Sequence, residues 1–216
     1  YCLLAGQGIT AFSPDTRNLV DDIATFKPTM LLVVPRVMEK VYNAASSKAG
    51  SGIKGRMFAW SAKQARAYSL ASEKTFGPGL FKKIRHGIAD AFVLKKIRSI
   101  LGPNLRYIVS GGAPLATDLA HFYAGMGITL IQGYGLSETT GPIAVQHIGK
   151  TPVGGVGLPL PGNFITIAKD GEILVRGQSV MPGYYHLPEQ TAEVMPDGTW
   201  FHTGDLGSID RKGQLT

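Results

Sequence analysis

Short apolar runs alternate with helical stretches through the first two thirds of the sequence. Three runs are compact, rich in branched apolar residues and flanked by turn signals; they are "MLLVV" (30–34), "LRYIVS" (105–110) and "ITLIQ" (128–132). Buried parallel strands show this pattern. Between the last two runs, "APLATDLAHFYAGMG" places its apolar residues on one helical face, and they are Leu115, Leu119, Phe122, Tyr123 and Met126. The pattern predicts a strand–helix–strand unit.

The character of the sequence changes after about residue 148. Glycine and proline become dense, and two alternating runs, "FITIA" and "EILVR", are joined by "KDG", a hairpin signal. We therefore expect an α/β fold in which a parallel, doubly wound sheet with helices occupies residues 1–147. A small antiparallel, β-barrel-like subdomain is expected over residues 148–216.

The basic residues are concentrated in one segment. Residues 48–98 hold twelve of the 22 lysines and arginines but only two of the 15 acids, a net charge of +10. The other 10 bases and 13 acids give −3. This segment has a helical pattern, and we expect it to form a basic helical insertion over about residues 46–100. Apolar residues lie near one face of each helix: Met57, Trp60, Ala67 and Leu70 in one, and Ile84, Ile88, Ala91, Ile97 and Ile100 in the next.

Three interpretations of the basic segment compete. It can be a solvated helical face, a surface attracted to anionic lipid headgroups, or a nucleic-acid contact. Aromatic residues are not interleaved with the bases as stacking platforms would be, and we therefore expect no nucleic-acid partner.

Composition narrows the setting of the protein. With 216 residues and 44% hydrophobic content, the chain can bury a sizeable core. Cys2 is the only cysteine, which excludes an internal disulfide, and an inert core thiol is favoured over a nucleophile. No segment has the length of apolar sequence needed to span a membrane, and no signal peptide is recognisable. We expect a cytoplasmic protein. Peripheral contact with the inner membrane face is compatible with that location.

Two of the predicted strands run into glycine-rich turns, "GGAPL" and "GYGLSETTG". In open parallel sheets, ligands bind outside the carboxyl ends of the strands, where backbone N–H groups can point at an anion. Tyr134 offers a ring for stacking, and Ser137 and Thr139 can donate to phosphate oxygens. Glu138 would repel a phosphate directly, and holding Mg²⁺ is therefore the role that suits it. The alternative is a glycine turn whose acid faces solvent.

A second candidate site is the stretch "WFHTGDLGSID" (200–210). The carboxylate of Asp205 can accept hydrogen bonds from two neighbouring hydroxyls, such as those of a ribose. A turn aspartate without a ligand is the alternative interpretation.

The ordered set "SGGAPL", "QGYGLSETTG", "VRGQSVMPGYY" and "WFHTGDLGSID" resembles the AMP-forming acyl-CoA synthetases, the adenylate-forming superfamily. The stretch "FKPTMLLVVPRVMEKVY" and the basic helical segment after it are similar to the long-chain fatty acid–CoA ligase branch. The resemblance implies that one set of residues lines the adenine and acyl pocket or brackets the adenine ring: Gly111, Gly112, Ala113, Gln132, Gly133 and Tyr134.

The same resemblance implies a catalytic set of Ser137, Glu138 and Thr139. Ser137 stands where the family usually has threonine, keeps the hydroxyl and would contact the α-phosphate. Glu138 would bind Mg²⁺, and Asp205 would hold the ribose hydroxyls.

The implied reaction joins a fatty acid to ATP as an acyl-adenylate and then transfers the acyl group to coenzyme A, releasing AMP and pyrophosphate. Two alternatives are a ligase that passes the acyl group to a carrier protein and a non-catalytic nucleotide or lipid-surface binding module. The family's "TSGTTG" phosphate loop, its "GRxK" hinge and the following catalytic lysine do not occur in this sequence. We therefore expect a fragment of the large N-terminal domain, inactive when isolated.

Overall fold

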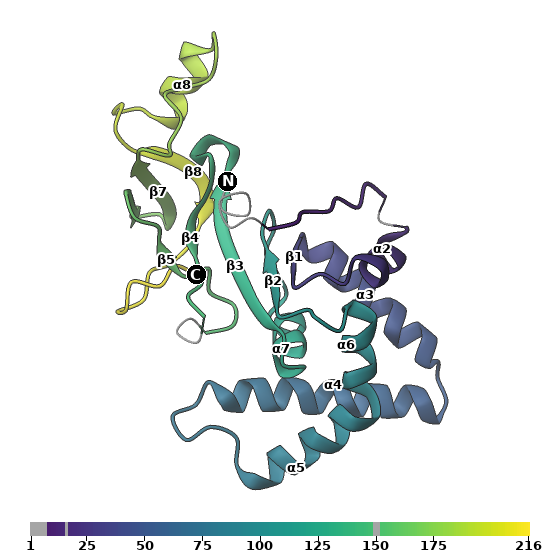
Figure 1. Ribbon diagram of the computed structural model, residues 1–216. Coiled ribbons are helices and arrows are strands. Elements are labelled where there is room, and N and C mark those ends of the chain that lie inside the picture. Colours follow the sequence, from purple (N-terminus) through teal and green to yellow (C-terminus); the bar gives the residue numbers. More distant parts are fainter. Residues whose placement is uncertain (1–7, 16, 149–151) are drawn as a thin grey trace. The chain divides into compact units, whose positions relative to one another are not determined.

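The computed structural model describes residues 8–15, 17–148 and 152–216 (Figure 1). Cys2 lies outside the described residues, so its predicted role stays a prediction. The chain divides into two compact units. The helical unit comprises Tyr1–Leu31, Arg36–Ile108 and Phe122–Ile128, and the sheet unit comprises Leu32–Pro35, Val109–His121 and Thr129–Thr216. The predicted boundary between residues 147 and 148 also stays a prediction.

The described helices are α2 (Leu19–Phe26), α3 (Pro35–Ala49), α4 (Ile53–Ser72), α5 (Leu80–Ala89), the π-helix η1 (Asp90–Leu94), α6 (Lys95–Leu101), α7 (Thr117–Gly125), the 3₁₀ turn η2 (Ser137–Thr139) and α8 (Pro188–Val194). The described strands are β1 (Met30–Val33), β2 (Tyr107–Ser110), β3 (Thr129–Leu136), β4 (Gly141–Val145), β5 (Leu158–Pro159), β6 (Asn163–Ile167), β7 (Glu172–Gly177) and β8 (Phe201–Leu206). No described helix is both long and apolar enough to cross a membrane.

The strands form two sheets (Figure 1). One has the order β1-β2-β3-β4-β5, and the other has the order β6-β7-β8. Helix α7 connects the neighbouring strands β2 and β3, as the crossover of a parallel pair does, whereas β4 pairs antiparallel with both β3 and β5. The predicted α/β class and the antiparallel sheet after it are confirmed, and the larger sheet is mixed.

Strand β3 is longer than the sequence predicts. The apolar run indicated an end near Gln132, but the strand continues through the glycines to Leu136 because β4 folds back and pairs with it. A Cβ atom on Gly135 would lie 2.1 Å from the carbonyl oxygen of Gly141, so only glycine permits this approach. The chain therefore reverses at η2 and Thr140, whose φ of 55° is left-handed.

Helix α7 confirms its predicted face, because all five predicted residues are buried. In the helical unit the Phe122 ring meets the edge of Tyr42 at a centroid distance of 4.9 Å. The Tyr123 hydroxyl donates a hydrogen bond of 2.8 Å to the Met38 carbonyl. Desolvation raises the pKa of this phenol, which keeps it a donor.

The apolar face predicted for α4 is not the face that it buries. Met57 and Leu70 are exposed, and the buried face consists mainly of small residues: Phe58, Ser61, Ala62, Ala65, Ser69 and Ala71. The reason is a close backbone approach within the helical unit. A Cβ atom on Gly125 would lie 2.1 Å from the Ala65 carbonyl oxygen, and large side chains cannot fit between helices this close.

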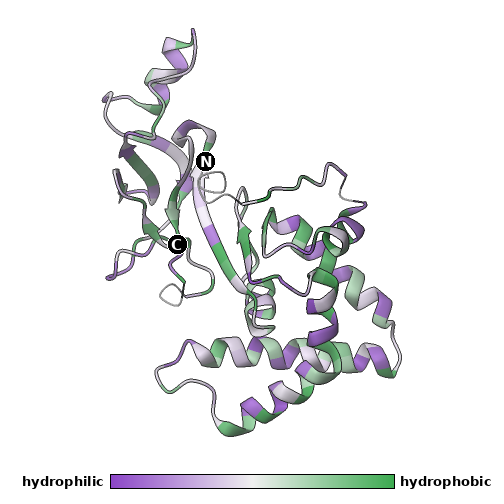
Figure 2. Cartoon of the chain, viewed as in Figure 1, coloured by the Kyte–Doolittle hydropathy of each residue, from purple (hydrophilic) through white to green (hydrophobic). Residues whose placement is uncertain are grey.

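The predicted face over α5 and α6 is also largely wrong, because only Ile97 of its five residues is buried. The buried residues here are Ala89, Leu94, Ile97 and Leu101. A π-turn, η1, lies between the two helices and changes the helical repeat, so one straight stripe cannot stay buried along both. Figure 2 shows both apolar and hydrophilic residues along α5.

Candidate active site

The reversal between β3 and β4 carries the three predicted catalytic residues. Thr139 is fully buried, and its hydroxyl accepts a hydrogen bond of 2.9 Å from the Leu136 N–H. The same oxygen lies 3.0 Å from the Leu136 carbonyl and 2.8 Å from the Gly141 carbonyl, either of which can accept its proton. In this structure Thr139 closes the turn, and Ser137 beside it is exposed.

Glu138 is held from the segment that precedes α8. The Tyr184 hydroxyl donates a hydrogen bond of 3.0 Å to Oε1 of Glu138, and the Met181 N–H donates one of 2.7 Å to the Glu138 carbonyl. The bond to this carboxylate raises the pKa of the Tyr184 phenol. The motif "VRGQSVMPGYY", which sequence reasoning quoted without assigning a role, thus supplies the partner of Glu138.

Asp205 lies on an irregular part of β8, in the sheet unit that also contains β3. The Tyr134 hydroxyl donates a hydrogen bond of 2.7 Å to Oδ2 of Asp205. Burial, followed by the Asp205 carboxylate, raises the pKa of the Tyr134 phenol, although the Thr203 hydroxyl acts in the opposite direction. Tyr134 therefore remains a donor, and the structure brings these two predicted nucleotide-binding residues together.

The predicted adenine-pocket residues lie where β2 ends and along β3. A Cβ atom on Gly111 would lie 3.7 Å from the Gly133 carbonyl oxygen, so these two backbones are close neighbours. Gly112 has a left-handed φ of 79°, which favours glycine. Ala113 after it is exposed.

Gln132 is buried, and part of its hydrogen-bonding capacity is unused. Its backbone N–H donates a bond of 2.8 Å to the Gln146 side chain, whose own amide donates one of 2.6 Å to the Gly155 carbonyl. Among the described residues, three buried side-chain groups have no partner: the Nε2 of Gln132, the hydroxyl of Ser110 and, on α4, the hydroxyl of Ser61. Leaving such a group unpaired costs about 1–3 kcal/mol. A ligand with an acceptor at this end of the strands would remove that cost.

The described residues contain no cluster of three or more His, Cys, Asp or Glu side chains that could hold a metal ion. Glu138 would contribute its carboxylate to a bound cation, which would also need phosphate oxygens or water as ligands. Mg²⁺ is commonly bound in this way, and the donor chemistry of Glu138 fits it.

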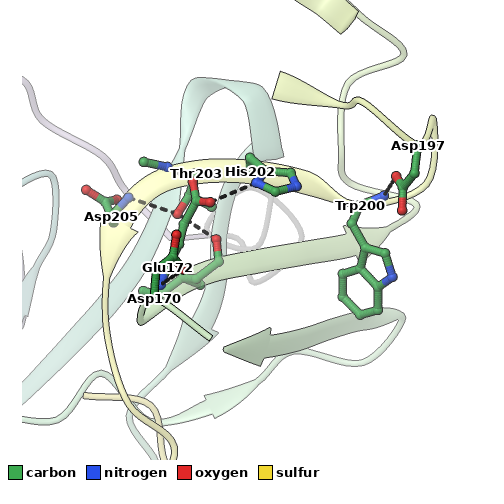
Figure 3. Close-up of polar contacts among 9 residues, drawn as sticks. Asp170, Glu172, Asp197, Trp200, His202, Thr203 and Asp205 are labelled. Carbon is green, nitrogen blue, oxygen red and sulfur yellow. Dashed lines mark hydrogen bonds and ion pairs between the residues drawn. The ribbon is translucent and has the colours of Figure 1, made fainter. Parts of the chain in front are cut away.

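Sequence reasoning missed Tyr184, Gln146 and Glu172. The Glu172 carboxylate contacts the backbone next to Asp205 (Figure 3). Each of the three contacts a predicted residue, or the backbone next to one, that lies at least 14 residues away in the sequence. Gln146 and Glu172 reach their partners beside paired strands, and Tyr184 reaches Glu138 from the segment before α8, so no local pattern indicates these contacts.

The chain belongs to the AMP-binding enzyme family, which it matches over residues 1–185. It is 48% identical over 205 residues to the long-chain-fatty-acid–CoA ligase FadD15 of Mycobacterium bovis, covering 95% of this chain and 34% of the relative. It is 32% identical over 231 residues to the long chain acyl-CoA synthetase 3 of Arabidopsis thaliana, covering 99% of this chain and 34% of that protein. The chain thus spans about a third of the length of these relatives.

Solved structures agree on the fold. The N-terminal domain of FACL13 from Mycobacterium tuberculosis, in an inhibitor-bound crystal structure, matches 96% of this chain and 42% of its own with a TM-score of 0.57 at 19% identity. The anthranilate CoA ligase AuaEII, in complex with anthranoyl-AMP, matches 96% of this chain and 33% of its own with a TM-score of 0.60 at 18% identity. The fold predicted from the ordered motifs is therefore confirmed.

Proposed function

We propose that the intact protein is an ATP-dependent long-chain fatty acid–CoA ligase. The observation that carries this proposal is the bond between Tyr134 and Asp205, which joins the predicted adenine residue to the predicted ribose residue within one unit. The 48% identity to a long-chain-fatty-acid–CoA ligase supports the choice of a fatty acid as the acyl substrate.

In this proposal the nucleotide lies along the end of β2 and the glycines of β3. The backbones of Gly111 to Ala113 and of Gln132 to Tyr134 accept the flat adenine ring, since small residues there leave room beside the backbone. The unpaired Nε2 of Gln132 provides a donor for a ring nitrogen or another acceptor. The Asp205 carboxylate accepts hydrogen bonds from the ribose hydroxyls.

The reaction then needs two anions to meet. A carboxylate oxygen of the fatty acid attacks the α-phosphorus of ATP, and the bond to the pyrophosphate oxygen breaks. The exposed hydroxyl of Ser137 donates to an α-phosphate oxygen, and the Thr139 hydroxyl keeps the turn in place. When bound through Glu138, Mg²⁺ would offset charge on the phosphate oxygens. In the second half, the thiolate sulfur of coenzyme A attacks the acyl carbonyl, and AMP leaves with the electron pair.

The test uses the full-length protein that contains this chain. With palmitate, ATP and Mg²⁺, we expect pyrophosphate release and, once coenzyme A is added, a palmitoyl thioester detected by mass spectrometry. Asp205→Ala should lower kcat/KM for ATP by at least ~100-fold, about 2.7 kcal/mol. The matched control is Asp197→Ala, because Asp197 is also a carboxylate of the sheet unit but caps a turn just before β8 begins.

Three outcomes of this assay have different meanings. Adenylate formation without a coenzyme A thioester would favour transfer to a carrier protein. No pyrophosphate release with any fatty acid, from a folded full-length protein, would overturn the ligase proposal. Equal losses in Asp205→Ala and Asp197→Ala would remove the ribose assignment while leaving the ligase activity.

We also propose peripheral contact with an anionic membrane surface, for a protein that uses ATP and coenzyme A in the cytoplasm. The supporting observation is a row of large apolar side chains that are exposed within the helical unit: Leu80, Phe81, Ile84, Ile88 and Phe92. Exposed bases lie among and after them: Lys82, Lys83, Arg85, Lys95 and Lys96. An amphipathic helix with this composition binds anionic headgroups by charge and the lipid boundary by apolar contact.

Flotation of the full-length protein with vesicles tests this surface. We expect binding to phosphatidylcholine vesicles that contain phosphatidylglycerol, and little binding to phosphatidylcholine alone. Combining Phe81→Ala, Ile84→Ala and Ile88→Ala should reduce partitioning into vesicles by at least ~10-fold, because each substitution removes apolar area that the lipid would bury. Leu187→Ala, at an exposed apolar residue outside this helix, is the control. Unchanged binding in the triple variant would exclude α5 as the contact.

A further inference from the structure

Asp205 lies in a bulge between β7 and β8. In this antiparallel pair Glu172 is opposite Leu206 and Leu174 is opposite His202. One residue of β7 is therefore opposed by three residues of β8, the Thr203–Gly204–Asp205 sequence. A bulge re-aims a side chain but removes ladder hydrogen bonds, so its backbone donors need other partners.

Side chains supply those partners. The Thr203 hydroxyl donates 2.8 Å to the Ile173 carbonyl and accepts 3.1 Å from the Asp205 N–H. Oε1 of Glu172 accepts a hydrogen bond of 2.8 Å from the Gly204 N–H (Figure 3). Gly204 has a φ of 74°, a left-handed conformation that a backbone bond at this residue helps to fix.

The second oxygen of Glu172 is also engaged. Its Oε2 lies 2.7 Å from Nδ1 of His202, the residue that precedes the bulge. The Glu172 side chain is only 18% exposed, so it is held between β7 and β8. One carboxylate thus bridges the ring of His202 and the backbone of Gly204. Asp205 is the residue that follows Gly204.

We propose that Glu172 is a positioning residue for the nucleotide site, holding the bulge so that the Asp205 carboxylate faces the ribose hydroxyls. The inference rests on the proposed function, because it requires that Asp205 binds ribose. Glu172 itself would touch neither nucleotide nor acyl group. Its contribution would be to fix Asp205 before the nucleotide arrives, which avoids the entropy cost of ordering it on binding.

Two neighbouring carboxylates show why Glu172 is singled out. Asp170 accepts a hydrogen bond of 3.1 Å from the Glu172 N–H in the β6–β7 turn. Asp197 accepts bonds of 2.8 and 2.9 Å from Thr199 and Trp200 before β8 begins. Figure 3 shows Asp197 at the other end of β8 from Asp205. Of these three acids, only Glu172 contacts the bulge.

The test compares two nucleotides in the full-length protein by calorimetry, ATP and 2′,3′-dideoxy-ATP, which lacks both ribose hydroxyls. The ratio of their Kd values reports ribose recognition and is independent of the fraction of protein that is folded. For the wild type we expect ATP to bind about 30-fold more tightly than the dideoxy compound, as for hydrogen bonds to a charged group. Asp205→Ala should bring the ratio close to one.

The variants of Glu172 then separate positioning from general stability. Glu172→Ala should lower the ratio to below about fivefold, while the affinity for 2′,3′-dideoxy-ATP stays within about twofold of wild type. Glu172→Gln should keep most of the discrimination, because its amide oxygen can accept from Gly204 and its NH₂ can donate to an unprotonated Nδ1 of His202. Asp197→Ala, the matched control, should lower the melting temperature without changing the ratio.

Combining Glu172→Ala with Asp205→Ala should cause no further loss of discrimination, since both act through the same contact. A full 30-fold ratio in Glu172→Ala, or equal weakening of both nucleotides, would overturn the positioning role while leaving the proposed function in place. A wild-type protein that does not distinguish the two nucleotides would overturn the ribose assignment and this inference together.

Discussion

Close backbone approaches form by different means within the sheet unit and within the helical unit. Around the candidate site, the backbone is irregular, and polar side chains such as Thr139 and Glu172 satisfy the groups that the ladder leaves unpaired. In the helical unit, α4 is a regular helix, and small residues such as Ala65 and Gly125 let two segments touch. The comparison shows that precise placement of a carboxylate depends on hydrogen bonds, whereas the arrangement of helices depends on side-chain volume.

The largest expected effect is on the irregular backbone of the sheet unit. Gly135→Ala should destabilise this unit by more than about 3 kcal/mol, because its Cβ would overlap the Gly141 carbonyl and the backbone would have to move. Gly133→Ala is the control, since its Cβ would make only an ordinary contact at 3.5 Å. Hydrogen exchange of the full-length protein measures both. Equal protection of β3 and β4 in the two variants would contradict the close approach.

The second prediction concerns the helical faces. Ile97→Ala should destabilise the helical unit by about 3 kcal/mol, because it leaves a cavity at a site that is 6% exposed. Ile88→Ala, at 46% exposure, should change the unfolding free energy by less than about 0.5 kcal/mol. Denaturant titration of each variant tests the difference. Similar losses of unfolding free energy at both positions would indicate that one apolar stripe is buried along both helices.

The third prediction concerns a charged contact that spans η1. Arg98 forms an ion pair with Asp90 and donates a hydrogen bond of 2.7 Å to the Met126 carbonyl. Arg98→Ala should therefore destabilise the helical unit by about 1.5 kcal/mol at neutral pH. The control is Arg17→Ala, whose ion pair with Asp15 is exposed to solvent, and it should have no measurable effect.

The same ion pair makes this loss dependent on pH. The hydrogen bond from Arg98 lowers the pKa of Asp90 below its ordinary 3.8. The pair therefore stabilises the fold above that value, and its contribution disappears as the pH falls through the lowered pKa. Unfolding curves should show the gap between wild type and Arg98→Ala narrowing in acid below 3.8. A gap that stays constant over this range would show that the Met126 bond alone is responsible.

The smallest effect is expected at the hydrogen bond of Tyr123. Tyr123→Phe removes the donor to the buried Met38 carbonyl and should destabilise the helical unit by about 1 kcal/mol. Phe122→Leu, beside it in the aromatic cluster, tests ring packing instead of hydrogen bonding. No change in the melting temperature of Tyr123→Phe would mean that the Met38 carbonyl finds another partner.

Sequence patterns predicted most of the strands and the buried face of α7, because continuous branched apolar runs and one strong helical stripe leave few alternatives. They failed where side-chain size mattered more than hydrophobicity. On α4, serine and alanine are buried and Met57 is exposed, since a close backbone approach leaves no room for large residues. Along α5 and α6, the π-turn shifts a repeat that the sequence cannot reveal in advance.

For the candidate site, the motifs located the carboxylates but not the residues that hold them. Tyr134 and Asp205 were predicted from separate motifs, and the structure joins them by one hydrogen bond. Tyr184 and Glu172 were not predicted, because their partners lie 46 and 32 residues away in the sequence. The Glu172 contact depends on strand register, and the Tyr184 contact depends on the path of the segment before α8. Neither is visible in a local pattern.

The bulge in β8 also determines which changes in length this strand can tolerate. Three residues opposite one represent an insertion of two, and an even insertion preserves the in-and-out alternation of the strand that follows. The bulge can therefore change length by two residues while Leu206 keeps its orientation. Deleting Gly204 alone would invert the orientation of Asp205 and Leu206, the two residues of β8 that follow it.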